Sequence, residues 1–298
     1  MKRNPTNCLP TSSSKYCSPV GNTVIRATAS RALLTKQEFS PEEERAFRWF
    51  LGEYRDQLGP IEDDIREFLR GASDTDLSSL DAIRTELEGR FGAYTSDFEV
   101  VFREGGEQGA AAGRELAARR FGLDIAFDTI PERTLEEIDD WVDVAAGSTL
   151  ETITEDATRW LRGAHEEGLS IDEITEQLME LDEHLEETVA HRAARTAVNS
   201  TSRAGHHSAH EDAPGVVAER WISELRDNTR EDHEEAHGQT VGVDVRFEVG
   251  GVYMLHPGDP SAPVGQIANC LCQARPLFED DLTEAELEAV ESGERIWT

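Results

Sequence analysis

Residues 183–215 read EHLEETVAHRAARTAVNSTSRAGHHSAHEDAPG, and the way this stretch ends decides the fold class. Its spacing predicts a helix from about residue 183 to residue 208. Polar residues at near-helical intervals are expected on the exposed face of this helix: Arg192, Arg195, Asn199 and Arg203. Pro214-Gly215 then ends the helical pattern, and short strands and turns follow it. We therefore expect a mainly α N-terminal region followed by a small α+β C-terminal module.

Helical periodicity also fills the chain before this stretch. Ser40-Pro41-Glu42-Glu43 offers an N-cap, a proline at the first helical position and acids in the first turn. The helix that begins there is expected to stop at Gly59-Pro60, and a second helix to end at Gly71. Further helices are predicted over 77–91, 105–120, 134–146, 149–167 and, after a capping box at Ser170, 171–181. Their apolar stripes are typical of core packing.

After Pro214-Gly215 the elements are shorter. The pattern predicts a helix over 221–235, strands over 240–247, 252–255 and 269–274, and a peripheral helix in the last twenty residues. We divide the chain into a disordered basic arm (1–37), a helical region (38–104), a second helical part (105–208), a compact α+β module (209–278) and an acidic tail helix (279–298).

The charge of the chain is strongly acidic. Asp and Glu number 61 against 29 Lys and Arg, a formal net charge of -32, and the only lysines are Lys2, Lys15 and Lys36. Such a surface would repel itself in dilute buffer, whereas molar salt shortens the Debye length to roughly 3 Å. We interpret the composition as that of a halophile's protein. A body this acidic would also repel the phosphates of nucleic acid.

The N-terminal residues 1–37 contain no Asp or Glu and are rich in Ser, Thr, Asn and Pro. A disordered tail is the simpler interpretation, and an arm that contacts packaged DNA or a partner surface is the alternative. The arm lacks the apolar core of a secretory signal, and no run of 18 apolar residues exists to cross a membrane. The four cysteines, Cys8, Cys17, Cys270 and Cys272, form no disulfide framework, so a reducing compartment is expected.

One group of residues has the composition of a metal site. Asp227, Arg230, His233 and His237 would share a face of the helix predicted over 221–235, and the thiols of Cys270 and Cys272 would lie on one side of a strand. Two thiolates with an imidazole and a carboxylate suit tetrahedral zinc, so Asp227, His233, Cys270 and Cys272 are the candidate ligands of a structural zinc ion.

Other interpretations of this group remain open. The cysteines would also fit a core as small apolar residues, with His233 and Asp227 hydrogen-bonded locally. A Cys–His nucleophile is a further alternative, but no Gly-rich oxyanion turn or known catalytic motif accompanies it. A second cluster, His206, His207 and His210, is expected at a solvated helix end.

The order of these residues resembles the phage Mu F-type head-morphogenesis family, the minor capsid proteins of tailed viruses. The resemblance spans roughly residues 105–276 and is carried by a series of short motifs. These are Ala194-Arg195-Thr196-Ala197-Val198-Asn199, Trp221, the run from Asp227 through Arg230 to His233, Gly238-Gln239, Phe247, Pro257-Gly258-Asp259-Pro260 and Asn269-Cys270-Leu271-Cys272. Leu271 stands where the family has Arg between the two cysteines, which puts any role of that Arg in doubt here.

The resemblance implies a structural role rather than an enzymatic one. Members are similar in associating with the portal or the procapsid interior, so portal, major capsid or scaffold proteins are the expected partners. The expected location is the virion, at the capsid interior or portal vertex, after assembly in the host cytoplasm. With the acidic composition, this points to a tailed virus or provirus of a halophilic archaeon. The alternative is a metal- or Cys-dependent enzyme using His233, Cys270 and Cys272, which would require an open pocket beside the cluster.

Overall fold

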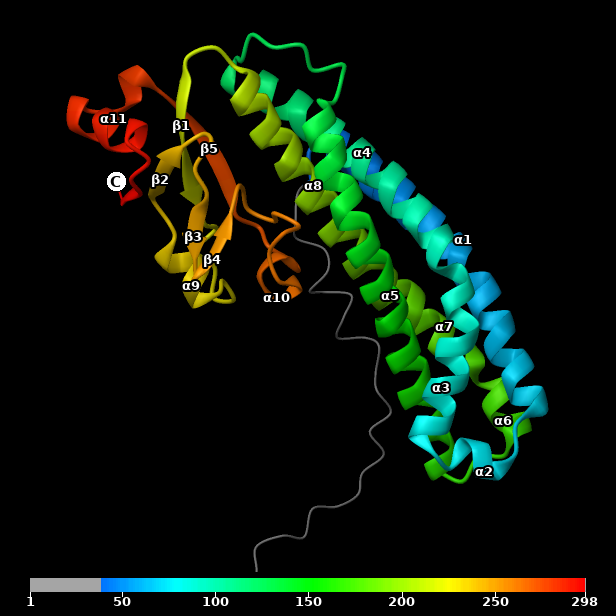
Figure 1. The fold of residues 1–298 in the computed structure, drawn as a ribbon. Helices are drawn as coiled ribbons and strands as arrows, with labels where there is room; N and C mark the ends of the chain where they lie inside the picture. Colours follow the sequence, from blue (N-terminus) through cyan, green and yellow to red (C-terminus); the bar gives the residue numbers. More distant parts are fainter. Residues whose placement is uncertain (1–38, 298) are drawn as a thin grey trace, which may run out of the picture. The chain divides into compact units, whose positions relative to one another are not determined.

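The computed structural model describes residues 39–297, which belong to one compact unit. The expected fold class is confirmed: helices, several of them long, dominate residues 41–212, and a small module of antiparallel strands and short helices follows (Figure 1). The basic arm, with Cys8 and Cys17, lies outside the described residues. No helix in the range 39–297 combines the length and apolar character needed to cross a bilayer.

The first helix is longer than the sequence predicted. Helix α1 (Pro41–Gly71) begins with the expected Ser40/Glu43 capping box but continues through Pro60, so the predicted stop at Gly59-Pro60 was wrong. Pro60 lies on the exposed side of α1, as does Asp56, so water can reach the Asp56 carbonyl that the missing N–H leaves without a partner. Leu58 and Ile61 flank it and are buried. Their burial keeps the chain helical across the proline.

The remaining helices complete an elongated bundle. They are α2 (Asp74–Leu77), α3 (Leu80–Phe91), a 3-10 turn (Gly92–Tyr94), α4 (Thr95–Phe121), α5 (Glu132–Glu166), α6 (Ile171–Glu176), α7 (Leu178–His184), a π-helical turn (Leu185–Ala190) and α8 (His191–Asp212). The two helices predicted over 134–146 and 149–167 are one helix, α5, because Gly147 and its neighbours keep the same buried face. The capping box at Ser170 is confirmed.

Helices α4 and α8 pack together at glycine positions. A Cβ atom on Gly113 would lie 2.0 Å from the backbone oxygen of Ser202, and one on Gly205 would lie 2.0 Å from that of Ala110. Only glycine allows two helix backbones to approach this closely. As a result, α8 is buried on nearly all sides between residues 197 and 210. Asn199 and Arg203 are therefore buried, and only Arg192 of the four residues expected on the exposed face is exposed.

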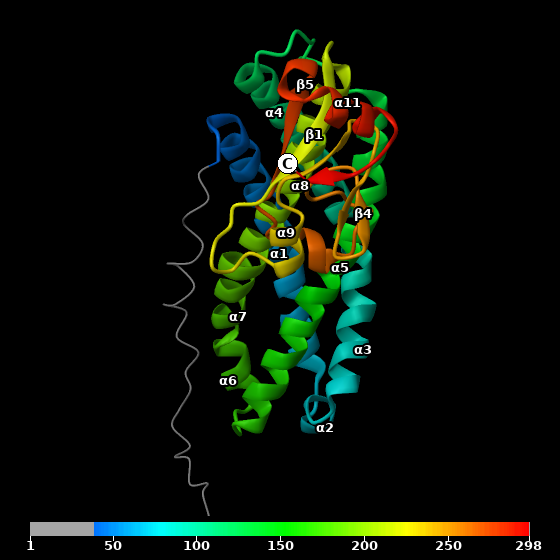
Figure 2. The same ribbon diagram turned by 90° about the vertical axis from the view of Figure 1, so that its left-hand side faces the viewer.

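The C-terminal module is a four-stranded antiparallel sheet with a separate hairpin (Figure 2). The sheet order is β5-β1-β2-β6, formed by β5 (Gln273–Phe278), β1 (Val216–Ile222), β2 (Gln239–Gly242) and β6 (Ile296–Trp297). The hairpin joins β3 (Phe247–Val249) to β4 (Val252–Met254). Short helices α9 (Glu231–Glu235), α10 (Val264–Ile267) and α11 (Glu284–Glu291) and a 3-10 turn (Glu279–Asp281) connect the strands.

Several predicted boundaries in this module were wrong. Trp221 belongs to strand β1, and the helix predicted over 221–235 shrinks to the five residues of α9. The strand predicted over 240–247 is two strands, and the strand predicted over 269–274 begins only at Gln273. The tail contains its predicted helix, α11, and ends in strand β6 at the sheet edge. Sheet pairing of β1 with β2 and β5 explains the first difference, because it satisfies the backbone of 216–222 without a helix.

Candidate metal centre and a buried histidine network

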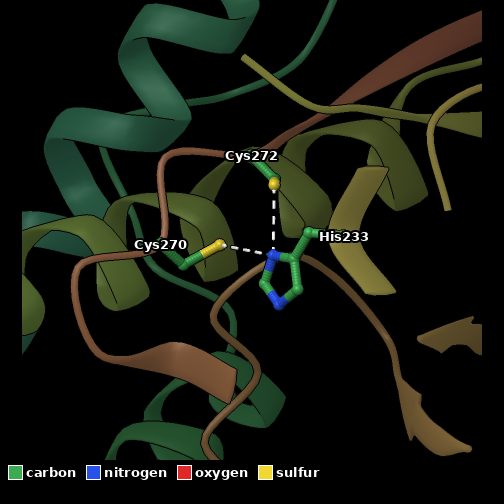
Figure 3. Close-up of side chains that lie close together, drawn as sticks. All are labelled: His233, Cys270 and Cys272. Atoms are coloured by element: carbon green, nitrogen blue, oxygen red, sulfur yellow. Dashed lines mark hydrogen bonds between the residues drawn. The ribbon is translucent and has the colours of Figure 1, made fainter. Parts of the chain in front are cut away.

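His233, Cys270 and Cys272 meet inside the C-terminal module (Figure 3). The Nδ1 atom of His233 lies 3.3 Å from the Sγ atom of Cys272 and 3.6 Å from that of Cys270. All three side chains are buried, and their ligand atoms lie within 4.8 Å of one another. This group could hold a metal ion.

Neighbouring side chains fix the orientation of the His233 ring. Its Nε2 atom lies 2.8 Å from Oε1 of Gln266, so Nε2–H donates to this amide oxygen and leaves Nδ1 facing the thiols. The amide nitrogen of Gln266 in turn donates to the carboxylate of Asp232. Metal-binding histidines commonly have such a hydrogen-bonded partner on the second ring nitrogen. The two sulfur atoms and the nitrogen atom therefore suit zinc, and so does the hydrogen-bonded partner on the second ring nitrogen of His233.

The two thiols differ in their acidity. The Cys272 S–H and His233 point at the sulfur of Cys270, and these contacts lower the pKa of Cys270 well below its usual value. The hydrogen bond to Cys270, together with burial, raises the pKa of Cys272. Burial lowers the pKa of His233, but its hydrogen bond and charge interaction with Cys270 more than offset this and raise it. A single thiolate, on Cys270, is thus already stabilised, and a thiolate is the form that binds metal.

Asp227 does not join this group, contrary to the sequence-based prediction. It is exposed in a turn before α9, where the N–H of Arg226 donates to Oγ1 of Thr229. Helix α9 spans only Glu231–Glu235, so Asp227, Arg230 and His237 lie outside it, and the common helical face predicted for them with His233 does not exist. The structure supplies three candidate ligands rather than the four predicted.

The loop that contains the two cysteines is held from several elements. Asn269 has a φ of 54°, a left-handed conformation that Asn adopts more readily than most residues. Its N–H approaches Oγ1 of Thr196 on α8 at 3.5 Å, and Arg230 donates to the carbonyl of Ala268 at 2.6 Å. Arg203 donates from Nε to the carbonyl of Cys272 at 3.0 Å. The loop geometry therefore depends on motif residues that lie far apart in the sequence.

Arg203 also ties this loop to the first helix. Its Nη1 atom lies 3.4 Å from Oε1 of Glu43, which accepts a 2.7 Å hydrogen bond from Ser202 as well. Both side chains of this ion pair are buried. The other carboxylate oxygen of Glu43 accepts the N–H of Ser40 in the capping box. A buried charge needs such partners, so α1, α8 and the cysteine loop are mutually dependent.

The other residues of the resemblance have local structural roles. Gly238 has a φ of 83° and donates its N–H to the carbonyl of Trp221, which joins α9 to the sheet. The Gln239 side chain donates to the carbonyl of Glu248 and accepts its N–H. Asp259 accepts hydrogen bonds from the N–H groups of Leu255 and Ser261 and shapes the turn.

The remaining motif residues are buried to different degrees. Trp221 is fully buried, and Asn199 is buried on α8. Arg195 is half-buried, which lowers its pKa.

A second cluster, the buried histidine network, was missed by sequence reasoning. Glu219 of strand β1 is fully buried and accepts from Nδ1 of His207 at 2.9 Å and from Nδ1 of His210 at 2.5 Å. Burial raises the pKa of Glu219, but the charge of His207 and the hydrogen bonds from both rings outweigh it and lower the pKa to about 2. Burial lowers the pKa of His207, but the charge of Glu219 and the hydrogen bond to it outweigh this effect and raise the pKa. The prediction of a solvated helix end for these histidines was therefore wrong.

Two more histidines extend the network. His256 stacks near His207 with ring centroids 5.6 Å apart, and its Nε2 lies 2.5 Å from the Glu137 carboxylate on α5. Burial lowers the pKa of His256, but the charge of Glu137 and the hydrogen bond to it raise it to about 9. His206 is also buried, and this burial, with the charge of Arg203, lowers its pKa well below its usual value. One feature of the sequence could have indicated that this part of α8 is buried: residues 188–210 contain no Asp or Glu in a chain with 61 acids.

Comparison with known proteins gives one distant relative. Over 194 residues the chain is 27% identical to the uncharacterized protein YqbB of Bacillus subtilis, covering 62% of this chain and 63% of that protein. The chain therefore spans less than two thirds of the relative's length. No family model matches the chain, and no solved structure matches it.

Proposed function

We propose that this chain is a minor capsid protein of the head-morphogenesis type, which associates with the portal or the procapsid interior of a tailed virus. The observation that supports the proposal best is the convergence of its motif residues on one junction. Thr196, Arg230, Asn269 and the two cysteines meet there, where they hold the backbone of the cysteine loop or pack beside it. Such an arrangement suits an assembly protein, whose module must keep one shape while it binds its partners.

The burial of the His/Cys/Cys centre supports a structural role over an enzymatic one. Cys270 and Cys272 are 5% and 3% exposed, and His233 is 2% exposed. A catalytic centre needs an open coordination position or an accessible nucleophile, which this burial disfavours. In a structural site, Nδ1 of His233 and the two Sγ atoms would bind zinc, and the ion would supply a cross-link between α9 and the cysteine loop.

The acidic surface supports assembly in concentrated salt. Positive charge in the described residues comes from Arg and His alone, and much of it is paired with carboxylates along the helices. We place the protein in the virion, at the capsid interior or portal vertex, and in the host cytoplasm during assembly. Portal, major capsid or scaffold proteins are the proposed partners, with a weak contact between residues 1–37 and packaged DNA.

Co-purification tests the proposal directly. The full chain and the portal protein of the same virus are produced together in molar KCl and separated by size. We expect a stable complex containing about one zinc ion per chain. As a control, Met179→Ser at an exposed position of α7 should leave the complex unchanged. A folded chain that elutes alone would contradict the assembly role, and assays of hydrolysis with the Cys270→Ser variant would then test the enzymatic alternative.

A further inference from the structure

A pocket opens between the helical region and the C-terminal module, and its lining does not include His233, Cys270 or Cys272. Its volume is about 140 Å³, and its walls come from α5, the start of α8 and the segment 260–268. This volume is close to that of a cavity of roughly 150 Å³ that holds benzene in another protein. It therefore has room for one bulky apolar side chain.

The chemistry of the walls matches such a side chain. Phe102, Trp141, Val189 and Ile267 contribute apolar surface. Val144 and Val264 also line the pocket, yet they are 54% and 51% exposed, so they lie at its mouth. Half-exposed valines that flank an apolar hollow leave a surface that a partner would bury.

One charged residue, Arg192, lines this pocket. Most arginines of the bundle pair with carboxylates, but within residues 39–297 Arg192 has no hydrogen bond or ion pair. The charge of Arg192 also reaches Tyr54 of α1: burial raises the pKa of Tyr54, and Arg192 opposes this increase. In a chain with 61 acids, an arginine without a carboxylate is available for a carboxylate from outside.

We propose that this pocket binds a segment of a partner protein in which a bulky apolar residue stands next to Asp or Glu. The apolar side chain fills the pocket, and the neighbouring carboxylate pairs with Arg192. Ser148, Thr152 and Thr196 also line the pocket. The hydroxyls of Ser148 and Thr152 already donate to the carbonyls of Ala145 and Ser148, so their oxygens are left to accept hydrogen bonds from N–H groups of the bound segment. The choice of the portal protein as the source of this segment rests on the proposed function; the recognition chemistry does not.

A selection from a random library of ten-residue peptides tests the inference with the full chain as bait, at the lowest KCl concentration that keeps it folded. We expect the enriched peptides to share an aromatic or branched aliphatic residue within two positions of Asp or Glu. Binding of these peptides should fall at least tenfold for Val264→Glu and Arg192→Glu. Two controls place the same charge changes elsewhere: Met179→Glu on α7 and Arg70→Glu at the end of α1 should bind as wild type does. All four positions are exposed, so the variants should fold.

The charge reversal provides an independent test. Selection against Arg192→Glu should replace the acidic residue of the enriched peptides by Lys or Arg and keep the apolar one. Peptides that bind Val264→Glu and Met179→Glu equally well, or a selection that yields none, would overturn the inference. If the portal complex forms but the selection yields no peptide that Val264→Glu weakens, the pocket inference fails while the assembly role stands. If the apolar-acidic peptides bind and the portal protein does not, the assembly role fails while the pocket inference stands.

Discussion

The bundle core and the junction between α8 and the C-terminal module are both buried but differ in chemistry. In the bundle, Phe50, Tyr54, Phe98 and Phe102 pack edge to face with ring centroids 5.0–6.5 Å apart. At the junction, the buried residues include Arg203, Glu219 and four histidines. Apolar packing carries no charge and is insensitive to pH, whereas buried charges must meet specific partners. The bundle therefore supplies stability, and the junction fixes how the module sits on α8.

The largest effect should come from the bundle. Phe98→Ala removes a fully buried ring that lies 5.1 Å from Tyr54, and the cavity should cost about 3–5 kcal/mol of unfolding free energy. Denaturant unfolding in molar KCl at pH 6 and pH 9 measures it. The cost should be the same at both pH values, because no titrating group is lost. A cost that depends strongly on pH would contradict the difference in pH dependence between the bundle core and the junction.

The junction should respond differently to Glu219→Gln. This change keeps the shape but leaves His207 and His210 without their buried counter-charge, and it should cost about 3 kcal/mol. The cost should be greater at pH 6 than at pH 9, because the pKa of His207 is raised only in the presence of the carboxylate. Glu211→Gln, at a half-buried neighbour of the same network, is the control and should cost less. Equal costs for the two variants would contradict the role of Glu219 as the main counter-charge of His207 and His210.

His256 makes the junction sensitive to alkali. Its folded-state pKa of about 9 lies above the ordinary 6.5, so its contribution is complete below pH 6.5 and is lost as the pH rises through 9. Stability should fall by up to about 3 kcal/mol across this window. Unfolding of His256→Gln should show a flatter profile between pH 6.5 and 9. His184→Gln, which removes an exposed histidine paired with Asp156, should leave the wild-type profile intact.

The smallest effect is expected on the surface. Arg90 and Glu86 form a partly exposed pair four residues apart on α3, and Arg90→Ala should cost less than about 0.5 kcal/mol. Thermal unfolding at two KCl concentrations measures it. A cost comparable to that of Glu219→Gln would remove the distinction between exposed and buried charge pairs.

Sequence patterns predicted the bundle better than the junction, for a physical reason. A long helix repeats its apolar face many times, so the stripe through Leu58, Ile61 and Ile65 indicated a helix even though Pro60 misplaced its end. A five-residue helix such as α9 is too short to repeat an apolar face, so its bounds cannot be found from periodicity. The positive φ of Leu225, which precedes it, is not marked by any residue pattern either. The histidines of α8 were assigned to solvent because imidazoles occur in both environments, and only their partner Glu219, on another element, decides between them.

The candidate site was predicted in part for the same reason. His233, Cys270 and Cys272 do come together, as their residue types suggested. The prediction assumed that they lie on a helix and a strand, whereas both cysteines lie in a loop before β5. Asp227 was included because of a helical spacing that the chain does not adopt. The contacts that position the cluster, from Arg203 and Gln266, depend on tertiary structure alone.

Unfolding of the full chain with and without one equivalent of zinc tests whether the His/Cys/Cys centre is a structural site. We expect zinc to raise the unfolding midpoint of the wild type. Cys270→Ser and His233→Gln should lose this increase, and Asp227→Asn, whose carboxylate lies outside the centre, should keep it. A midpoint that zinc leaves unchanged in the wild type, or raises equally in Cys270→Ser, would contradict this structural role.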